Sequence, residues 1–236
     1  MNKLEWDSKF FGIQIASSTF DLIDKQILDR LMSKLLEEQI DLCYLNTSHP
    51  IPDDIIKNYP INYSNSKILF TKKLISTNED TSTYIRSLPS SSIPDTCINI
   101  SRQTGHHSRF KNDQKLPQGS YEKLYDEWIT QSIRRTISDE VLVFESEKKI
   151  EGLITLKKKD ASVVIGLLGV DELSRGKKIG QSLIKEAENY TIQCGINILD
   201  VSTQGSNRAA VRFYEKAGFA RKNTTFIYHL WPNYHH

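Results

Sequence analysis

The stretch VVIGLLGVDELSRGKKIGQSLIKEAENY, residues 163–190, constrains the fold more than any other part of the sequence. Its first part is rich in β-branched and apolar residues, as strands are, and from Ile179 onward apolar residues recur at helical spacing. A basic turn containing Gly176 lies between the two, and Gly180 follows at the start of the helix. A helix that begins just after such a turn presents unpaired backbone N–H groups and the positive end of its dipole, which together bind anions. The sequence therefore predicts a strand–turn–helix unit that binds phosphate.

Cationic side chains strengthen this expectation, because Arg175, Lys177 and Lys178 all belong to the turn. Two familiar phosphate motifs do not fit the stretch, which has no GxxxxGK[ST] and no GxGxxG after a first strand. The pattern is instead Arg175, two residues, Lys178, one residue and Gly180, after a strand that ends LLGV.

LLGVDELSRGKKIGQSLI resembles the acetyl-CoA motif of the GNAT acetyltransferases, Q/R-x-x-G-x-G/A after a strand with a valine five residues before the Arg. Val170 occupies the place of that valine. The resemblance implies that the strand at Leu168 and Val170 binds the pantetheine arm of acetyl-CoA through its backbone. The pyrophosphate would then lie on the turn of Arg175, Gly176, Lys177, Lys178, Ile179 and Gly180. Lys178 stands where the first motif glycine usually does, and we expect a helical φ there to keep its Cβ away from the anion.

STQGSNRAAVRFYEKAGF, further along, resembles the second GNAT signature, an Asn that opens a helix carrying a Tyr before a Gly-Phe turn. Asn207 and Tyr214 fall at the matching positions. The resemblance implies that Asn207 and Phe213 contact acetyl-CoA and that Tyr214 protonates the leaving thiolate. The simpler interpretation of Tyr214 is a structural tyrosine that packs the helix on the sheet. The group that takes the proton of the amine is left open among His106, an acidic residue such as Glu140, and a chain of water molecules.

Three further stretches, LEWDSKFFGIQI, GHHSRFKND and YEKLYDEWITQSI, are similar to the TDP-fucosamine N-acetyltransferase group within this family. The resemblance implies that the acceptor is a nucleotide-linked amino sugar. His106 and Arg109 lie in the polar loop of residues 105–113, and we expect both to bind this substrate. The planar guanidinium of Arg109 suits a diphosphate.

The aromatic residues of these stretches have simpler interpretations. Trp6, Phe10 and Phe11 are expected in the core, since large aromatic side chains dominate cores. Tyr125 and Trp128 fall on the apolar face of a predicted helix, where packing is the more common role.

The order of elements predicts a mixed α+β fold with a mainly antiparallel sheet, the GNAT fold. Residues 119–231 read as helix, three strands, helix, strand, helix and strand. Residues 76–96 are rich in Ser, Thr and Pro and are expected to form a linker. This linker separates a smaller N-terminal α+β domain, residues 1–75, which contributes to the acceptor site, from the acetyl-CoA-binding catalytic domain, residues 97–236.

Composition excludes some classes of protein and leaves others open. A net charge of +2 with 38% hydrophobic residues indicates a soluble globular protein with no general affinity for nucleic acid or membranes. We expect a cytoplasmic location, because no apolar run approaches a membrane span and the chain start lacks the apolar core of a signal peptide. The assembly, for which a homodimer is one option, is left open.

No metal is expected. The adjacent pairs His106–His107 and His235–His236 lack further ligands at suitable spacing, and the three cysteines form no CxxC pair. Two alternative functions remain. One is a GNAT enzyme that acetylates a protein N-terminus, a lysine or a small polyamine, and the other is a non-catalytic module that binds coenzyme A or a nucleotide. Retention of Tyr214 argues against the second.

Overall fold

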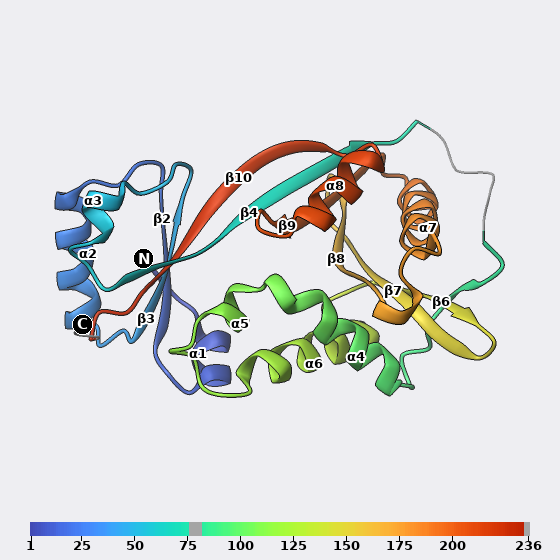
Figure 1. Cartoon of the computed structure of the whole chain (residues 1–236), viewed down its shortest axis with the longest axis horizontal. Coiled ribbons are helices and arrows are strands. Elements are labelled where there is room, and N and C mark those ends of the chain that lie inside the picture. Colours follow the sequence, from blue (N-terminus) through green and yellow to red (C-terminus); the bar gives the residue numbers. More distant parts are fainter. Residues whose placement is uncertain (76–81, 234–236) are drawn as a thin grey trace.

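A computed structural model describes residues 1–75 and 82–233. The described strands form one mixed, mostly antiparallel sheet in the order β1-β2-β3-β10-β4-β9-β8-β7-β6-β5 (Figure 1). The parallel neighbours are β2 with β3 and β8 with β9. The strands are β1 Asn2–Lys3, β2 Ile15–Phe20, β3 Leu42–Thr47, β4 Ile61–Lys73, β5 Ile85–Ser87, β6 Glu140–Ser146, β7 Lys149–Lys158, β8 Val163–Val170, β9 Ile198–Gln204 and β10 Ala220–Leu230. The predicted α+β class is confirmed.

Helices cover both faces of this sheet. They are α1 Glu5–Phe11, α2 Lys25–Glu37, α3 Asp53–Ile56, α4 Asp95–Thr104, α5 Arg109–Asn112, α6 Ser120–Ile133, α7 Ile179–Gln193 and α8 Arg208–Lys216, with short 3-10 turns at Gly105–His107 and Glu172–Ser174. The predicted order of elements over residues 119–231 is confirmed from α6 to β10.

The core has a separate layer on each face of the catalytic half of the sheet. Helices α7 and α8 cover one face through Leu183, Ala187 and Tyr214. Helices α4 and α6 cover the other face through Ile100 and Ile129. Figure 1 shows α4, α5 and α6 along the side of the molecule opposite α8. The sheet thus lies between the α7–α8 layer and the α4–α6 layer, and a site that contacts both α8 and α4 must pass through an opening in the sheet.

The long strands β4 and β10 run side by side and connect the two ends of the molecule (Figure 1). β10 pairs with β3 as well as β4, so segments from both predicted domains share one sheet. The division into domains stays a prediction. Of the segment expected as a linker, residues 76–81 lie outside the described part, and the remainder contains β5 and the first residues of α4.

At the chain start, helix α1 lies between β1 and β2. Phe11 is buried as expected, but Trp6 is 55% exposed and stacks on Phe10 with 5.0 Å between ring centroids. The core position expected for Trp6 is wrong. Successive helical residues are rotated by about 100°, so the turn that buries Phe11 directs Trp6 toward solvent.

Candidate active site

The strands β8 and β9 separate in the middle of the sheet. They pair only over Val163–Ile165 with Leu199–Val201. Beyond these residues, one edge of β8 faces an opening instead of a neighbouring strand. A strand edge of this kind offers alternate N–H and C=O groups, to which an extended ligand can bind as an added strand.

A β-bulge marks the point of separation. Ile154 pairs with Leu168 and Leu156 pairs with Ile165, so Gly166 and Leu167 of β8 lie opposite Thr155 alone. The Leu167 N–H donates to the Thr155 hydroxyl at 2.9 Å. Because a bulge bends a strand and increases its local twist, it directs the end of β8 away from β9.

A cavity of about 430 Å³ fills the opening between the two strands. This volume falls in the range of roughly 300–1,000 Å³ that is usual for small-molecule sites. Segments that contribute to its wall include β8, β9, α7, α8, α4, α6 and the Gly105–His107 turn. The predicted site residues that line it are His106, Leu168, Val170, Arg175, Gly180, Asn207, Phe213 and Tyr214.

The turn before α7 takes an unexpected backbone conformation. Gly176 has a φ of +86°, as glycine readily does, but Lys178 also has a φ of +63°. The expectation of a helical φ at Lys178 is therefore wrong. A left-handed residue directly before right-handed helical residues turns successive N–H groups toward one concave surface, and such a surface binds anions. The chain here keeps the conformation that favours glycine and places a lysine in it.

We predict that Lys178→Gly stabilises the protein relative to Lys178→Ala. Both variants remove the same charge, but only glycine relieves the left-handed strain, which costs a residue with a Cβ about 1 kcal/mol. Urea unfolding of the two variants measures the difference. An alanine variant as stable as the glycine variant would show that the turn carries no such strain.

Hydrogen bonds fix this turn in place. The Lys177 ammonium binds Glu151 at 2.9 Å, and the Ser174 hydroxyl donates to the same carboxylate oxygen. These two donors lower the pKa of Glu151. The Lys177 side chain is thus committed to the scaffold of the turn. Arg175 points its Nε toward the Val170 carbonyl at 3.4 Å and lines the cavity.

Helix α7 leaves its first amide groups available. Its earliest intrahelical bonds run from the N–H groups of Gln181 and Ser182 to the carbonyl of Lys178. The N–H groups of Ile179 and Gly180 therefore precede the helical ladder. Together with the dipole of this 15-residue helix they suit an anion, and the anion site expected from the sequence stays a prediction.

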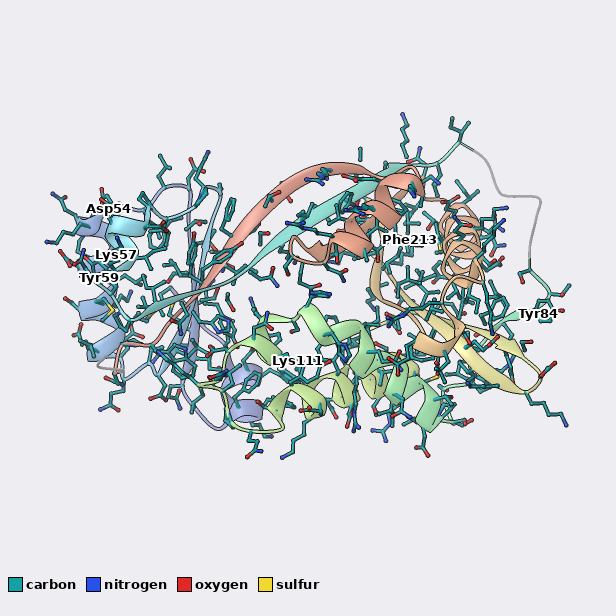
Figure 2. All side chains as sticks on the ribbon, in the orientation of Figure 1. Asp54, Lys57, Tyr59, Tyr84, Lys111 and Phe213 are labelled. Atoms are coloured by element: carbon teal, nitrogen blue, oxygen red, sulfur yellow. The ribbon has the colours of Figure 1, made fainter. Side chains whose placement is uncertain are left out.

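Gly180 contacts α8 across the cavity. A Cβ placed on Gly180 would lie 3.3 Å from the Phe213 ring. Figure 2 labels Phe213, which lies on α8 at the side near α7. A larger residue at position 180 would therefore press on Phe213 and narrow the cavity beside the turn.

Helix α8 is positioned by the residue that precedes it, its N-cap. The Asn207 side-chain oxygen accepts the N–H of Ala210 at 3.0 Å, which is an N-cap bond. Asn207 also lines the cavity, as does Tyr214 two turns later. The structure thus brings together the two residues of the second signature.

Tyr214 is 6% exposed and lies among Phe70, Phe213 and Phe219, with ring centroids 5.4–5.8 Å away. Burial raises the pKa of its phenol above the usual value near 10. Tyr214 therefore keeps its proton at neutral pH, at a wall of the cavity.

The two predicted substrate-binding residues, His106 and Arg109, both precede α6 but have different surroundings. His106 is exposed and lines the cavity. Partial desolvation, followed by the charges of Lys111 and Arg175, lowers its pKa, which favours a neutral imidazole at pH 7. Arg109 does not line the cavity. Arg109 is half-buried, and its guanidinium lies over the rings of Tyr44 and Phe110, at 4.2 and 4.6 Å from their centroids.

Some cavity residues were not expected from the sequence. Tyr125 and Trp128 pack as predicted, but they also line the cavity. Gln103 and Thr104 reach it from α4, a helix that falls at the expected linker boundary. Its sequence signal was Pro94 before an acidic first turn, followed by apolar residues at helical spacing.

Glu140 is placed away from the site. It lies on β6, where its carboxylate accepts from Arg135 at 2.6 Å and from Ser87 at 2.7 Å. It is not among the residues that line the cavity. Glu140 is therefore removed from the candidates for the general base.

The cavity has a clear charge character. Among its described lining residues there is no Asp or Glu, whereas Arg175 supplies a positive charge and His106 and His107 supply imidazoles. Within residues 1–75 and 82–233, no group of three or more His, Cys, Asp or Glu side chains is placed to hold a metal ion. His235 and His236 lie outside the described residues. None of the helices in the described part is both long and apolar enough to cross a membrane.

Comparison with known proteins gives a family match. The model of the acetyltransferase (GNAT) domain matches residues 110–229. A dTDP-fucosamine acetyltransferase of Escherichia coli is 29% identical over 121 residues, 50% of this chain and 51% of that protein. The spore coat polysaccharide biosynthesis protein SpsD of Bacillus subtilis is 22% identical over 133 residues, 56% of this chain and 46% of that protein. The chain therefore spans about half the length of these two relatives.

A solved structure shows the same fold. The crystal structure of a GCN5-related N-acetyltransferase from Sphaerobacter thermophilus superposes with a TM-score of 0.55 at 15% identity. The superposition covers 88% of this chain and 69% of that one. At this identity the likeness concerns the fold alone.

Proposed function

The chain belongs to the GNAT acetyltransferase family, and on that premise we propose that it transfers the acetyl group of acetyl-CoA to the amine of a nucleotide-linked amino-deoxy sugar, with TDP the favoured nucleotide. The observation that carries this proposal is the cavity between the separated strands, with an anion-binding turn at one end and a protonated phenol in its wall. The names of the two relatives support a sugar acceptor.

The residues present fit acetyl-CoA. The free edge of β8 at Leu168 and Val170 suits the amide groups of the pantetheine arm. The turn from Arg175 to Gly180 suits the pyrophosphate, through backbone N–H groups and the Arg175 side chain. Phe213 and Asn207 lie on the α8 side of the same cavity.

The transfer of the acetyl group requires two proton transfers, one to the leaving sulfur and one from the amine. Acetyl-CoA supplies the thioester, and the neutral amine attacks its carbonyl carbon. Backbone N–H groups near Val170 stabilise the oxyanion. As the C–N bond forms and the C–S bond breaks, Tyr214 gives its proton to the sulfur. The amine proton goes to a base, for which His106 and a water chain remain, since Glu140 lies outside the cavity.

The charge of the residues that line the cavity favours a nucleotide sugar over the alternative acceptors. Lysine side chains and polyamines are cations, and a site for them favours carboxylates. The described lining residues contain none and present basic and aromatic groups instead. A nucleotide sugar carries negative charge and stacks well on aromatic groups, so it suits such a lining better.

The deciding experiment is an acceptor panel. The protein is incubated with acetyl-CoA and nucleotide-linked amino sugars, polyamines or lysyl peptides, and the products are identified by mass. We expect acetylated nucleotide sugars. Products from peptides or polyamines alone would contradict the proposal, and coenzyme A binding with no product from any acceptor would favour a non-catalytic module.

We predict that Arg109→Met raises the KM for the nucleotide sugar at least about tenfold, since a lost bidentate charged hydrogen bond costs about 1.5–3 kcal/mol. Methionine preserves much of the packing between the two aromatic rings. The KM for acetyl-CoA should stay within twofold. Lys111→Met is the matched control, because Lys111 (labelled in Figure 2) lies on the same short helix, with its ammonium over the Tyr121 ring. Normal acceptor kinetics in Arg109→Met would remove this role.

A further inference from the structure

We propose that the acceptor lies along β4, with its diphosphate between Lys67 and Arg109 and its nucleoside in a groove beyond them. This inference rests on the proposed function and adds a second phosphate-binding residue, the place of the nucleoside and the direction of the substrate.

Lys67 stands at the rim of the cavity. It pairs with Gln204, the last residue of β9, and Gln204 lines the cavity. The chain then turns, and the Gly205 N–H donates to the carbonyl of Ser66 at 2.8 Å. From this point toward Ile61, β4 has lost β9 as a neighbour, so its edge is open on that side.

One face of β4 looks toward the loop that holds Arg109. The Asn65 side-chain nitrogen donates to the carbonyl of His107 at 2.8 Å, which ties β4 to the Gly105–His107 turn. Side chains two residues apart on a strand share a face, so Lys67 points to the same side as Asn65. The loop continues into α5, whose first residue is Arg109.

Lys67 and Arg109 are two neighbouring cations that no described carboxylate of the protein neutralises. In the part of the chain that the structure describes, neither makes an ion pair or a hydrogen bond with a carboxylate. Asp7 acts on Arg109 only at longer range. Partial desolvation, and then the charges of Arg109 and Lys159, lower the pKa of Lys67, as expected for cations gathered around a space. A diphosphate placed between them would relieve this repulsion.

The groove lies further along the same strand. It has a volume of about 440 Å³ and is lined by residues 62–64 of β4 and by residues 112–115, which include the end of α5. Asn62, Asn112 and Gln114 supply amide groups, and the open edge of β4 supplies peptide groups. These are the donors and acceptors that the hydrogen-bonding edge of a nucleobase requires.

The order along β4 matches the order of groups in a nucleotide sugar. The reacting sugar lies in the cavity at Gln204, the diphosphate at Lys67, and the nucleoside at Asn62. Lys67 and Asn62 are five positions apart on the strand, or about 16 Å, which suits an extended nucleoside diphosphate. The acceptor thus approaches the thioester from the β4 side, while acetyl-CoA binds from the turn before α7.

The test uses TDP and inorganic pyrophosphate as probes of protein saturated with coenzyme A, which occupies the turn of residues 175–180, with binding measured by calorimetry. We expect Lys67→Met to weaken both probes at least about tenfold, as loss of a charged contact does, and to leave coenzyme A binding within twofold. Asn62→Leu should weaken TDP and leave pyrophosphate unchanged. Lys73→Met is the matched control, because Lys73 is an exposed lysine at the far end of β4, opposite Ile198. Thermal unfolding confirms that each variant is folded.

Two results would overturn the inference. One is a TDP affinity in Lys67→Met within twofold of the wild type, and the other is a wild-type protein that binds pyrophosphate as tightly as TDP. The failure of the proposed function is a separate result. In that case the wild type acetylates peptides or polyamines and no nucleotide sugar. If a nucleotide sugar is acetylated with an unchanged KM in Lys67→Met, only the binding mode along β4 is wrong.

Discussion

Replacing Tyr214 by phenylalanine is expected to lower the single-turnover rate of acetyl transfer by about a hundredfold or more. The variant keeps the ring, which packs against Phe70 and Phe219, and removes only the proton donor. Folding and acetyl-CoA affinity should therefore stay near normal. Because burial raises the pKa of the phenol, Tyr214 should also keep its proton as the pH rises through 10, the ordinary value for tyrosine. Its deprotonation should cause no loss of rate below that pH.

Tyr228 offers the matched control for this experiment. It is a buried tyrosine on β10 whose hydroxyl accepts the N–H of Ile51 at 2.8 Å. Tyr228→Phe should cost about 1 kcal/mol of stability and leave the transfer rate unchanged. Single-turnover rates at saturating substrates separate the two roles. A difference below about threefold between wild type and Tyr214→Phe would remove the acid role, since a lost proton donor costs far more than that.

Gly180→Asp is expected to weaken the binding of coenzyme A by more than tenfold, roughly 1.4 kcal/mol or more. Two effects combine in this variant. The new carboxylate lies beside the anion site at the start of α7, where it repels the pyrophosphate. The new Cβ also comes 3.3 Å from the Phe213 ring and narrows the cavity.

Gly180→Asn separates the charge from the size, because asparagine has nearly the shape of aspartate and no charge. We expect Gly180→Asp to bind coenzyme A more weakly than Gly180→Asn, with the gap shrinking at high salt as screening increases. Calorimetric titration of both folded variants measures this. An unchanged dissociation constant in Gly180→Asp would rule out a pyrophosphate at this turn.

Local sequence patterns determined the parts of the site that are local in the structure. The strand, basic turn and helix around Arg175 are contiguous in the chain. The periodicity of their apolar residues and the positions of their glycines predict them. The same is true of α8, where Asn207 caps the helix and Tyr214 lies two turns along the same side. Hydrophobic period also predicted the three successive strands β6, β7 and β8, which are neighbours in the sheet as they are in the sequence.

Other features depend on contacts between distant segments, and only the tertiary structure decided them. The opening between β8 and β9 arises from a bulge opposite Thr155 and from where their pairing ends. Segments far away in the chain determine the surroundings of two residues. Trp128 lines a cavity that β8, β9 and α8 help to form, and Arg109 lies over the ring of Tyr44. The left-handed φ of Lys178 contradicts the local preference of lysine. Glu151 of β7 binds Lys177 and Ser174 and so fixes the shape of the turn, which outweighs the preference of lysine. No sequence pattern within the turn predicts this contact.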